Sequence, residues 1–286
     1  MKTINDLYSD ARKALLRQEE SSTASLMARN LLCQITEKTP EQVIADRMQY
    51  ASESWCLQME RAVNRLLAGE PLAYVLGKWE FFGLPLQVDS RVLIPRDDTC
   101  AVTELAIHYG LKLKTGLRIL DMCTGSGCIG LAIANRIKDA RVTLVDISKD
   151  ALAVAKSNIT NLKLSARVSC VQASALEQPK PFLGKFDMIV SNPPYITGRE
   201  MLELDASVKD FEPHLALFGG DDGLEFYRAI AANYKEALKP GGYLCFEFGM
   251  GQGNDVCNIL EENGYTILER TRDYNQIERA VLAQRK

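Results

Sequence analysis

The chain has 286 residues, of which 47% are hydrophobic and 25% are charged, enough for one large core and a second, smaller one. A formal net charge of −3 gives no overall positive field for a polyanion, so we expect no direct nucleic-acid binding. The sequence shows neither a signal-peptide core near Met1 nor an apolar run that could span a bilayer. We therefore expect no membrane partner and a cytoplasmic location.

The sequence contains few residues that are suited to metal binding or thiol chemistry. The eight cysteines are scattered without a CxxC pair, a pattern typical of free thiols rather than of disulfides or zinc ligands. His108 and His214 are the two residues that could supply an imidazole. We therefore expect no metal site.

The first 76 residues are predicted to form a small helical bundle. Apolar residues recur there at helix spacing, beginning with Ile4, Leu7, Ala11 and Leu15. We expect residues 21–23 to cap a second helix, Pro40 to lie in the first turn of a third, and Gly69 to end a long one. Positive and negative charges are nearly balanced here, which favours protein contact or plain packing over nucleic-acid binding.

A hairpin is expected over residues 77–95, where aromatic and aliphatic residues alternate around a break at residues 83–85. We interpret it as the link to a second domain, residues 96–286. Helices and strands alternate strictly in that domain, which predicts a parallel sheet with helices on both faces. The expected strands lie at 118–121, 141–146, 167–172, 186–191, 242–248, 266–270 and 278–282.

A glycine turn follows the first of these strands. Gly125 and Gly127 let the backbone bend tightly and let a ligand approach without meeting a Cβ atom. Together with Gly130 they satisfy the GxGxxG spacing. A nucleotide cofactor is therefore expected, either a nicotinamide dinucleotide or S-adenosylmethionine.

Two carboxylates flank this turn. Asp146 ends the second strand and can accept hydrogen bonds from both hydroxyls of a ribose, which either cofactor carries. Asp121 lies just before the glycines, where a carboxylate would oppose the pyrophosphate of NAD but could accept from the amino group of a methionine moiety. Asp121 therefore favours S-adenosylmethionine.

A stiff polar turn ends the strand at 186–191. It consists of Asn192, Pro193, Pro194 and Tyr195, and prolines cannot extend a central strand. Open α/β sheets bind their ligands at the carboxyl ends of strands, so this turn is a functional candidate. The prolines hold the Asn192 amide and the neighbouring carbonyls as oriented acceptors, which suit a substrate with an NH2 group.

In this order, the glycine turn, Asp146 and the turn at 192–195 resemble class I (Rossmann-like) S-adenosylmethionine-dependent methyltransferases that act on NH2 groups. Over nearly its full length the chain is similar to the HemK-type protein-(glutamine-N5) methyltransferases. Shared segments lie at 69–74, 93–96, 211–213, 219–224 and 238–242. The resemblance implies an α/β fold with a seven-stranded sheet, an N-terminal helical domain that recognises the substrate, and methylation of the Gly-Gly-Gln glutamine of class 1 peptide-chain release factors.

The resemblance also indicates which residues form the site. We expect Asn192 and the Pro193 carbonyl to accept the two N–H groups of the substrate amide, Pro194 to hold the turn and Tyr195 to pack against the amide plane. The cofactor residues implied by the motifs are Asp121, Cys123, Thr124, Gly125, Ser126, Gly127, Asp146, Ile147, Ser174, Ala175 and Asn192.

Three segments depart from the family pattern. Residues 96–100 read Arg-Asp-Asp-Thr-Cys, with one carboxylate fewer than usual. Ser174 and Ala175 stand where an acidic residue, commonly followed by an aromatic one, is expected beside the adenine. Residues 273–279 lack the glycine of an Asp-x-x-Gly-x-x-Arg signature. None of these touches the turn at 192–195, so the predicted reaction is unchanged.

Other interpretations fit parts of the sequence. A nucleic-acid amino methyltransferase could use the same turn on a flipped base. A nicotinamide-dependent oxidoreductase could use the glycine turn, and a non-catalytic adapter could retain only the fold. The helical bundle could also be a stability cap without a partner.

Overall fold

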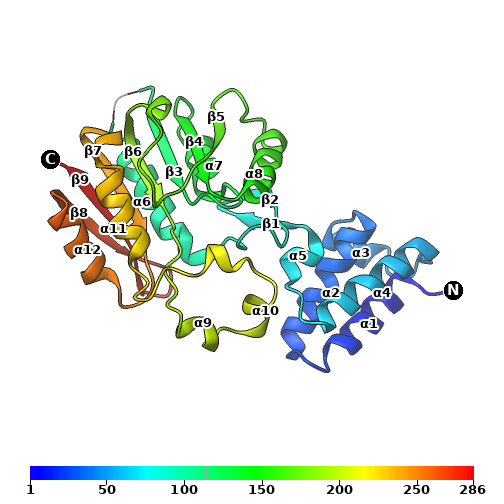
Figure 1. Cartoon of the computed structure of the whole chain (residues 1–286). Coiled ribbons are helices and arrows are strands. Elements are labelled where there is room, and N and C mark those ends of the chain that lie inside the picture. Colours follow the sequence, from blue (N-terminus) through cyan, green and yellow to red (C-terminus); the bar gives the residue numbers. More distant parts are fainter. Residues whose placement is uncertain (114) are drawn as a thin grey trace. The chain divides into compact units, whose positions relative to one another are not determined.

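A computed structural model describes residues 1–113 and 115–286 (Figure 1). The described chain divides into two compact units. Unit 1 comprises Met1–Lys78 and Ala206–Phe211, and unit 2 comprises Trp79–Asp205 and Glu212–Lys286.

Unit 1 is built from helices. They are α1 (Ile4–Leu15), α2 (Ser21–Thr36), α3 (Pro40–Ala45), α4 (Glu53–Leu67) and α5 (Leu72–Leu76), blue to cyan in Figure 1, with α10 (Ala206–Lys209) from later in the chain. The helix-spaced residues from Ile4 to Leu15 are at most 3% exposed and share one apolar core. The predicted helical periodicity is therefore confirmed.

Side-chain caps begin three of the helices in unit 1, namely α1, α3 and α4. Thr39 caps α3 by accepting from the N–H of Gln42, with Pro40 in the first turn as predicted. The cap predicted at residues 21–23 is wrong, because α2 begins at Ser21 and no side chain caps it. Ser21 instead accepts a hydrogen bond from Arg12 on α1 at 2.8 Å. Gly69 follows the end of α4 with φ +89°, a left-handed conformation that suits glycine.

The predicted hairpin is formed by β1 (Lys78–Phe81) and β2 (Leu84–Gln87). Phe82 and Gly83 make its turn with φ values of +53° and +75°, and two-residue hairpin turns favour such left-handed residues. The break therefore lies earlier than predicted, since Leu84 and Pro85 already belong to β2. In a two-stranded sheet every strand has a free edge, where proline is tolerated.

The predicted seven-stranded sheet is present in unit 2, with the strand order β5-β4-β3-β6-β7-β9-β8. Neighbours from β5 to β7 are parallel, and β9 is antiparallel to both β7 and β8. The strands are β3 (Arg118–Met122), β4 (Arg141–Asp146), β5 (Val168–Gln172), β6 (Phe186–Ser191), β7 (Leu238–Glu247), β8 (Tyr265–Arg272) and β9 (Glu278–Arg285). β7 begins at Leu238 rather than at residue 242, because Leu238 already pairs with Phe186 before an irregularity in the register.

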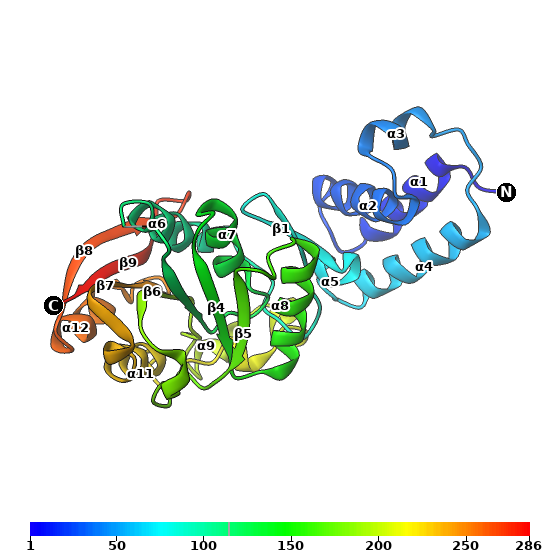
Figure 2. The same cartoon turned by 90° about the horizontal axis from the view of Figure 1, so that it is seen from above.

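Helices cover both faces of the sheet, as predicted (Figures 1 and 2). They are α6 (Cys100–Gly110), α7 (Cys128–Arg136) and α8 (Lys149–Asn161) on one face, and α11 (Glu225–Asn233) and α12 (Gly253–Glu262) on the other. Successive strand residues point to opposite faces, so Ile119 joins the first core and Leu120 the second. Both faces of the parallel strands are thus buried.

The strand order reverses at β3, which lies between β4 and β6. In open α/β sheets, ligands bind outside the carboxyl ends of the strands at such a point. Short helical turns complete the structure: η1 (Asp97–Thr99), η2 (Pro181–Leu183), α9 (Glu200–Glu203), η3 (His214–Ala216) and η4 (Lys235–Ala237). Among the described residues, no helix is both long and apolar enough to cross a bilayer.

Candidate active site

A cavity lies at the carboxyl edge of β3, β4 and β6 in unit 2. The predicted site residues that line it are Cys123, Gly125, Asp146, Ile147, Ser174, Ala175, Asn192 and Pro194. The predicted site residues outside its lining are Asp121, Thr124, Ser126, Gly127, Pro193 and Tyr195. The structure therefore brings the glycine turn, the end of β4 and the proline turn to one cavity.

Asp146 faces this cavity from the end of β4. Its Oδ2 accepts from the N–H of Gly125 at 2.9 Å, and its Oδ1 accepts from the N–H of Ser148 at 2.9 Å. The N–H of Ile147 is a third backbone donor to this carboxylate, which still keeps acceptor capacity for a ligand hydroxyl. Burial raises the pKa of Asp146, although these backbone donors act in the opposite direction.

Asp121 lies beneath the glycine turn and is fully buried. Its Oδ2 accepts from the Thr124 hydroxyl at 2.5 Å and from the N–H of Gly130 at 2.9 Å. Burial raises the pKa of Asp121 to about 7. Its Oδ1 has no hydrogen-bond partner among the described residues. Asp121 thus fixes the turn, and its contact with a cofactor amino group stays a prediction.

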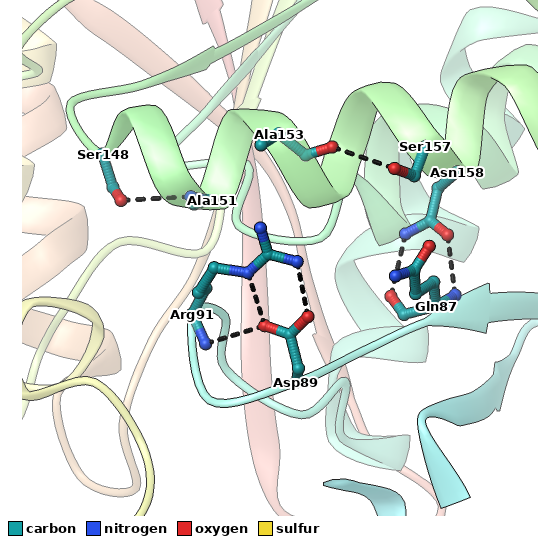
Figure 3. Close-up of polar contacts among 8 residues, drawn as sticks. All are labelled: Gln87, Asp89, Arg91, Ser148, Ala151, Ala153, Ser157 and Asn158. Atoms are coloured by element: carbon teal, nitrogen blue, oxygen red, sulfur yellow. Dashed lines mark hydrogen bonds and ion pairs between the residues drawn. The ribbon is translucent and has the colours of Figure 1, made fainter.

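Asn158 is a buried site residue that the sequence analysis missed. Its amide pairs with the backbone of Gln87 on β2, accepting at 2.7 Å and donating at 3.0 Å (Figure 3). It also donates to the Ser126 carbonyl in the glycine turn at 3.0 Å. A polar residue among the apolar positions of α8 was the available signal.

Arg91 lines the cavity from the segment after the hairpin. Its guanidinium makes two hydrogen bonds to Asp89, at 2.8 and 2.6 Å (Figure 3). The Arg91 hydrogen bonds lower the pKa of Asp89. The paired carboxylate therefore holds one wall of the cavity in place.

The proline turn is held by its surroundings. The Ser191 hydroxyl donates to the Met122 carbonyl at 2.7 Å, which ties β6 to β3 where both end. Behind the turn, Gln252 donates to the Tyr195 carbonyl at 3.1 Å. A Cβ atom on Gly219 would lie 2.6 Å from the Pro194 carbonyl oxygen, so glycine is needed for this close approach.

Asn192 lines the cavity, and its Nδ2 donates to the Thr99 hydroxyl at 3.3 Å. Tyr195 is half-buried, and burial raises the pKa of its phenol. The expectation that the unusual segment at residues 96–100 does not touch the proline turn is therefore wrong, because Thr99 contacts Asn192 although the two are far apart in the chain.

The unusual segments keep an ordered structure. Gln276, in the place of the missing glycine, adopts φ +65°, a left-handed conformation that costs a non-glycine residue energy. Asp273 still accepts from the N–H groups of Asn275 and Ile277, and Arg279 pairs with Asp98 at 2.9 Å. The signature is therefore maintained by hydrogen bonds in place of glycine.

Ser174 and Ala175 line the cavity where the family pattern predicts a carboxylate. The hydroxyl of Ser174 accepts from the N–H of Leu176 at 3.2 Å, and its carbonyl accepts from the Tyr234 hydroxyl at 3.0 Å. Ala175 lies beside it and is buried.

In the described parts of the chain, no His, Cys, Asp and Glu side chains are grouped as they would be around a metal ion.

Comparison with known proteins identifies the family. The family model of the PrmC N-terminal domain matches residues 6–77, and that of the methyltransferase small domain matches residues 103–209. The release factor glutamine methyltransferase of Clostridium acetobutylicum is 41% identical over 255 residues, which cover 89% of each chain. The chain belongs to the release factor glutamine methyltransferases.

A second member of the family, from Bradyrhizobium diazoefficiens, is 37% identical and matches 95% of this chain and 92% of its own. Among solved structures, a methyltransferase from Pyrococcus furiosus superposes with a TM-score of 0.51 at 17% identity, covering 79% of this chain and 98% of that one. The superposition shows the shared class I methyltransferase fold.

Release factor glutamine methyltransferases are S-adenosylmethionine-dependent enzymes. The predicted fold, enzyme class and cofactor are therefore confirmed. The interpretations as a nicotinamide-dependent oxidoreductase or a non-catalytic adapter are wrong.

Proposed function

We propose that this release factor glutamine methyltransferase methylates the side-chain amide nitrogen of the glutamine in the Gly-Gly-Gln motif of class 1 peptide-chain release factors. One observation carries the proposal: Asn192, on a turn stiffened by two prolines, lines the same cavity as Asp146 and Gly125. A side-chain amide that can accept hydrogen bonds is thus next to the predicted cofactor residues. Because translation termination takes place in the cytoplasm, this is the compartment that we propose.

The residues around the cavity suit S-adenosylmethionine, which supplies a methyl group on a positively charged sulfur when bound. Asp146 has free lone pairs for the ribose hydroxyls, and apolar residues such as Ile147 and Ala175 suit the adenine. A Cβ atom added to Gly125 would meet no atom within 4 Å, so the backbone there is open to a ligand. The unpartnered Oδ1 of Asp121 suits an amino group.

The task of the proline turn is positioning. A carboxamide nitrogen is a poor nucleophile, because its lone pair is delocalised into the carbonyl, so its orientation largely determines the rate. Asn192 Oδ1 and the Pro193 carbonyl accept its two N–H groups and stabilise the positive charge that develops on the nitrogen. Tyr195 packs against the amide plane. No strong base is required.

The helical domain, predicted as residues 1–76, is proposed to recognise the release factor. Unit 1 exposes three large apolar side chains close together in the sequence: Ile44 at 62%, Met48 at 72% and Tyr50 at 66%. Such a group of exposed apolar side chains suits a protein partner. Substituting all three by serine should raise KM for the intact release factor and leave cofactor binding unchanged. Leu111→Ser, at a 60% exposed position of unit 2, is the matched control.

A direct assay tests the reaction. The enzyme is incubated with S-adenosylmethionine and a release factor, and mass spectrometry locates the product. We expect a single methyl group on the Gly-Gly-Gln glutamine. Asn192→Ala should lower kcat roughly a hundred- to a thousandfold while cofactor binding is retained. A methyl group at another position of the release factor, or near-normal turnover of Asn192→Ala, would overturn the proposal.

A further inference from the structure

A buried carboxylate lies beside the proline turn and has no role in the function proposed above. Glu247 ends β7, which pairs with β6 so that Phe246 lies opposite Ser191. Glu247 is thus the neighbour of Asn192 at the next strand end, and it is 2% exposed. Its Oε2 has no hydrogen-bond partner among the described residues. Burying such a group is costly, which points to a functional reason for its presence.

Thr99 connects this carboxylate to Asn192. The Thr99 side chain is buried, and its hydroxyl accepts from Nδ2 of Asn192. The hydroxyl proton is then free to point toward Glu247. Burial raises the pKa of Glu247 to about 7, whereas Thr99 and Asn192 lower it, as donors to a carboxylate do. The hydrogen bonds therefore run in one order: the Asn192 amide donates to the Thr99 hydroxyl oxygen, and both side chains donate to the Glu247 carboxylate.

An ionised carboxylate can only accept hydrogen bonds, so this order allows one orientation of the Asn192 amide. Thr99 donates to Glu247, and Asn192 Nδ2 donates to both Thr99 and Glu247, which leaves Oδ1 free for the cavity that Asn192 lines. We infer that Glu247 is a positioning residue, which acts on the Asn192 amide directly and through Thr99 to keep its oxygen turned toward the substrate N–H groups. The inference rests on the proposed function, because that function gives Asn192 its role.

Protonation of Glu247 would remove the constraint. A neutral carboxyl can donate a hydrogen bond to Thr99, so the direction of the hydrogen bonds can reverse. Asn192 can then turn its own NH2 group toward the substrate NH2 group. Two NH2 groups are both donors and cannot bind each other. Turnover should therefore fall as the pH is lowered through the pKa of Glu247, about 7.

Charged and titratable groups from several elements face Glu247. They are Arg279 of β9, Asp98 of η1, Tyr195, Tyr227 of α11, Cys100 of α6 and Cys128 of α7. Arg279 favours the ionised carboxylate and Asp98 opposes it. Burial raises the pKa values of the tyrosines and cysteines, so these stay neutral near pH 7. Among these neighbouring groups, Glu247 is therefore the one expected to titrate near pH 7.

The pH profile of turnover on a release factor tests the inference. Glu247→Gln keeps the shape of the side chain, but its amide both donates and accepts and so fixes neither orientation. We expect its kcat to fall roughly ten- to a hundredfold and to lose its pH dependence near 7, with an unchanged KM for the cofactor. Thr99→Val should show a smaller change of the same kind, because the direct hydrogen bond from Asn192 to Glu247 remains, and Thr99→Ser should resemble the wild type.

Thr103→Val is the matched control, because Thr103 is buried and donates to the Thr99 carbonyl at 2.9 Å. It should keep the wild-type pH profile. Normal kcat and a normal profile in Glu247→Gln would overturn the inference while the proposed function stands.

A second measurement does not depend on turnover. Neutron diffraction from crystals of the whole protein at alkaline pD locates the deuterons of the Asn192 amide. We expect one of them between Nδ2 and the Thr99 hydroxyl oxygen. The opposite orientation would overturn the inference, whatever the substrate proves to be.

Discussion

The turns after β3 and β6 lie at adjacent strand ends and are made rigid in different ways. Side chains bind the backbone of the glycine turn, as Asp146 does at Gly125 and Asn158 does at Ser126. Close packing confines the proline turn, since Gly219 and Gly223 leave no room for a Cβ atom beside it. The glycine turn therefore depends on hydrogen bonds, whereas the proline turn depends on steric fit in addition to hydrogen bonds.

The largest effect should come from breaking the steric fit. In Gly223→Ala the new methyl group would overlap the Tyr195 carbonyl oxygen, and φ is +71°. We expect a loss of about 3 kcal/mol in the free energy of unfolding, measured with urea. Gly251→Ala is the control, with φ +88° but no atom within 4 Å of the new carbon. It should lose about 1 kcal/mol, and equal losses in the two variants would show that the close fit is unimportant.

Removing a hydrogen-bonding side chain at the glycine turn should have a smaller effect. Asp146→Ala is expected to weaken cofactor binding roughly ten- to a hundredfold, because a charged acceptor is lost. Its kcat at saturating cofactor should change little. Calorimetry measures the affinity for the cofactor. Asp139→Ala is the control, because Asp139 also accepts from a backbone N–H, that of Gly116, but at the other end of β3. Unchanged affinity in Asp146→Ala would remove this residue from the cofactor site.

The buried carboxylates at the two turns should make stability depend on pH. Burial raises the pKa values of Asp121 and Glu247 from 3.8 and 4.5 to about 7. Between these values the folded protein keeps protons that the unfolded chain releases, so the free energy of unfolding falls as the pH rises. The expected slope is up to about 1.4 kcal/mol per pH unit for each group.

Urea unfolding at several pH values between about 5 and 7 measures this slope. Asp121→Asn should reduce it, because the amide does not titrate in this range. A stability that stays constant over the range would show that neither carboxyl keeps its proton in the folded state.

The smallest effect is expected away from both turns. Gln276→Gly removes the left-handed strain at a residue with φ +65°. It should raise the free energy of unfolding by about 1 kcal/mol, visible as a higher Tm. Asn275→Gly, next to it, relieves no positive φ and should not stabilise the protein. A lower Tm for Gln276→Gly would contradict this explanation.

Most of the sheet and much of the cavity could be predicted from the sequence. Apolar runs bounded by turns located all seven strands. Because parallel strands place their carboxyl ends at one edge, Asp146 and Asn192 could be expected in the same cavity, which both line. The start of β7 was missed, since Pro240 and Gly241 look like a turn although they lie within the strand.

The residues that support the site could not be found in this way. Glu247 stands in an apolar strand, and Thr99 contacts Asn192 from a segment 93 positions away. Nothing in the local pattern predicts these contacts, which arise only when the strands assemble. Left-handed residues other than glycine, such as Cys123 with φ +57° and Gln276, were missed for a related reason. Their neighbours, rather than their own preferences, set the backbone.

The three hydrogen bonds of Asn158 have a consequence for local unfolding. They connect it to positions 71 and 32 residues away, in the hairpin and the glycine turn. If the hairpin detached alone, a buried amide would lose most of its partners, at a high cost in free energy. The two segments should therefore open as one cooperative unit, with their backbone amides exchanging hydrogen for deuterium at a common rate.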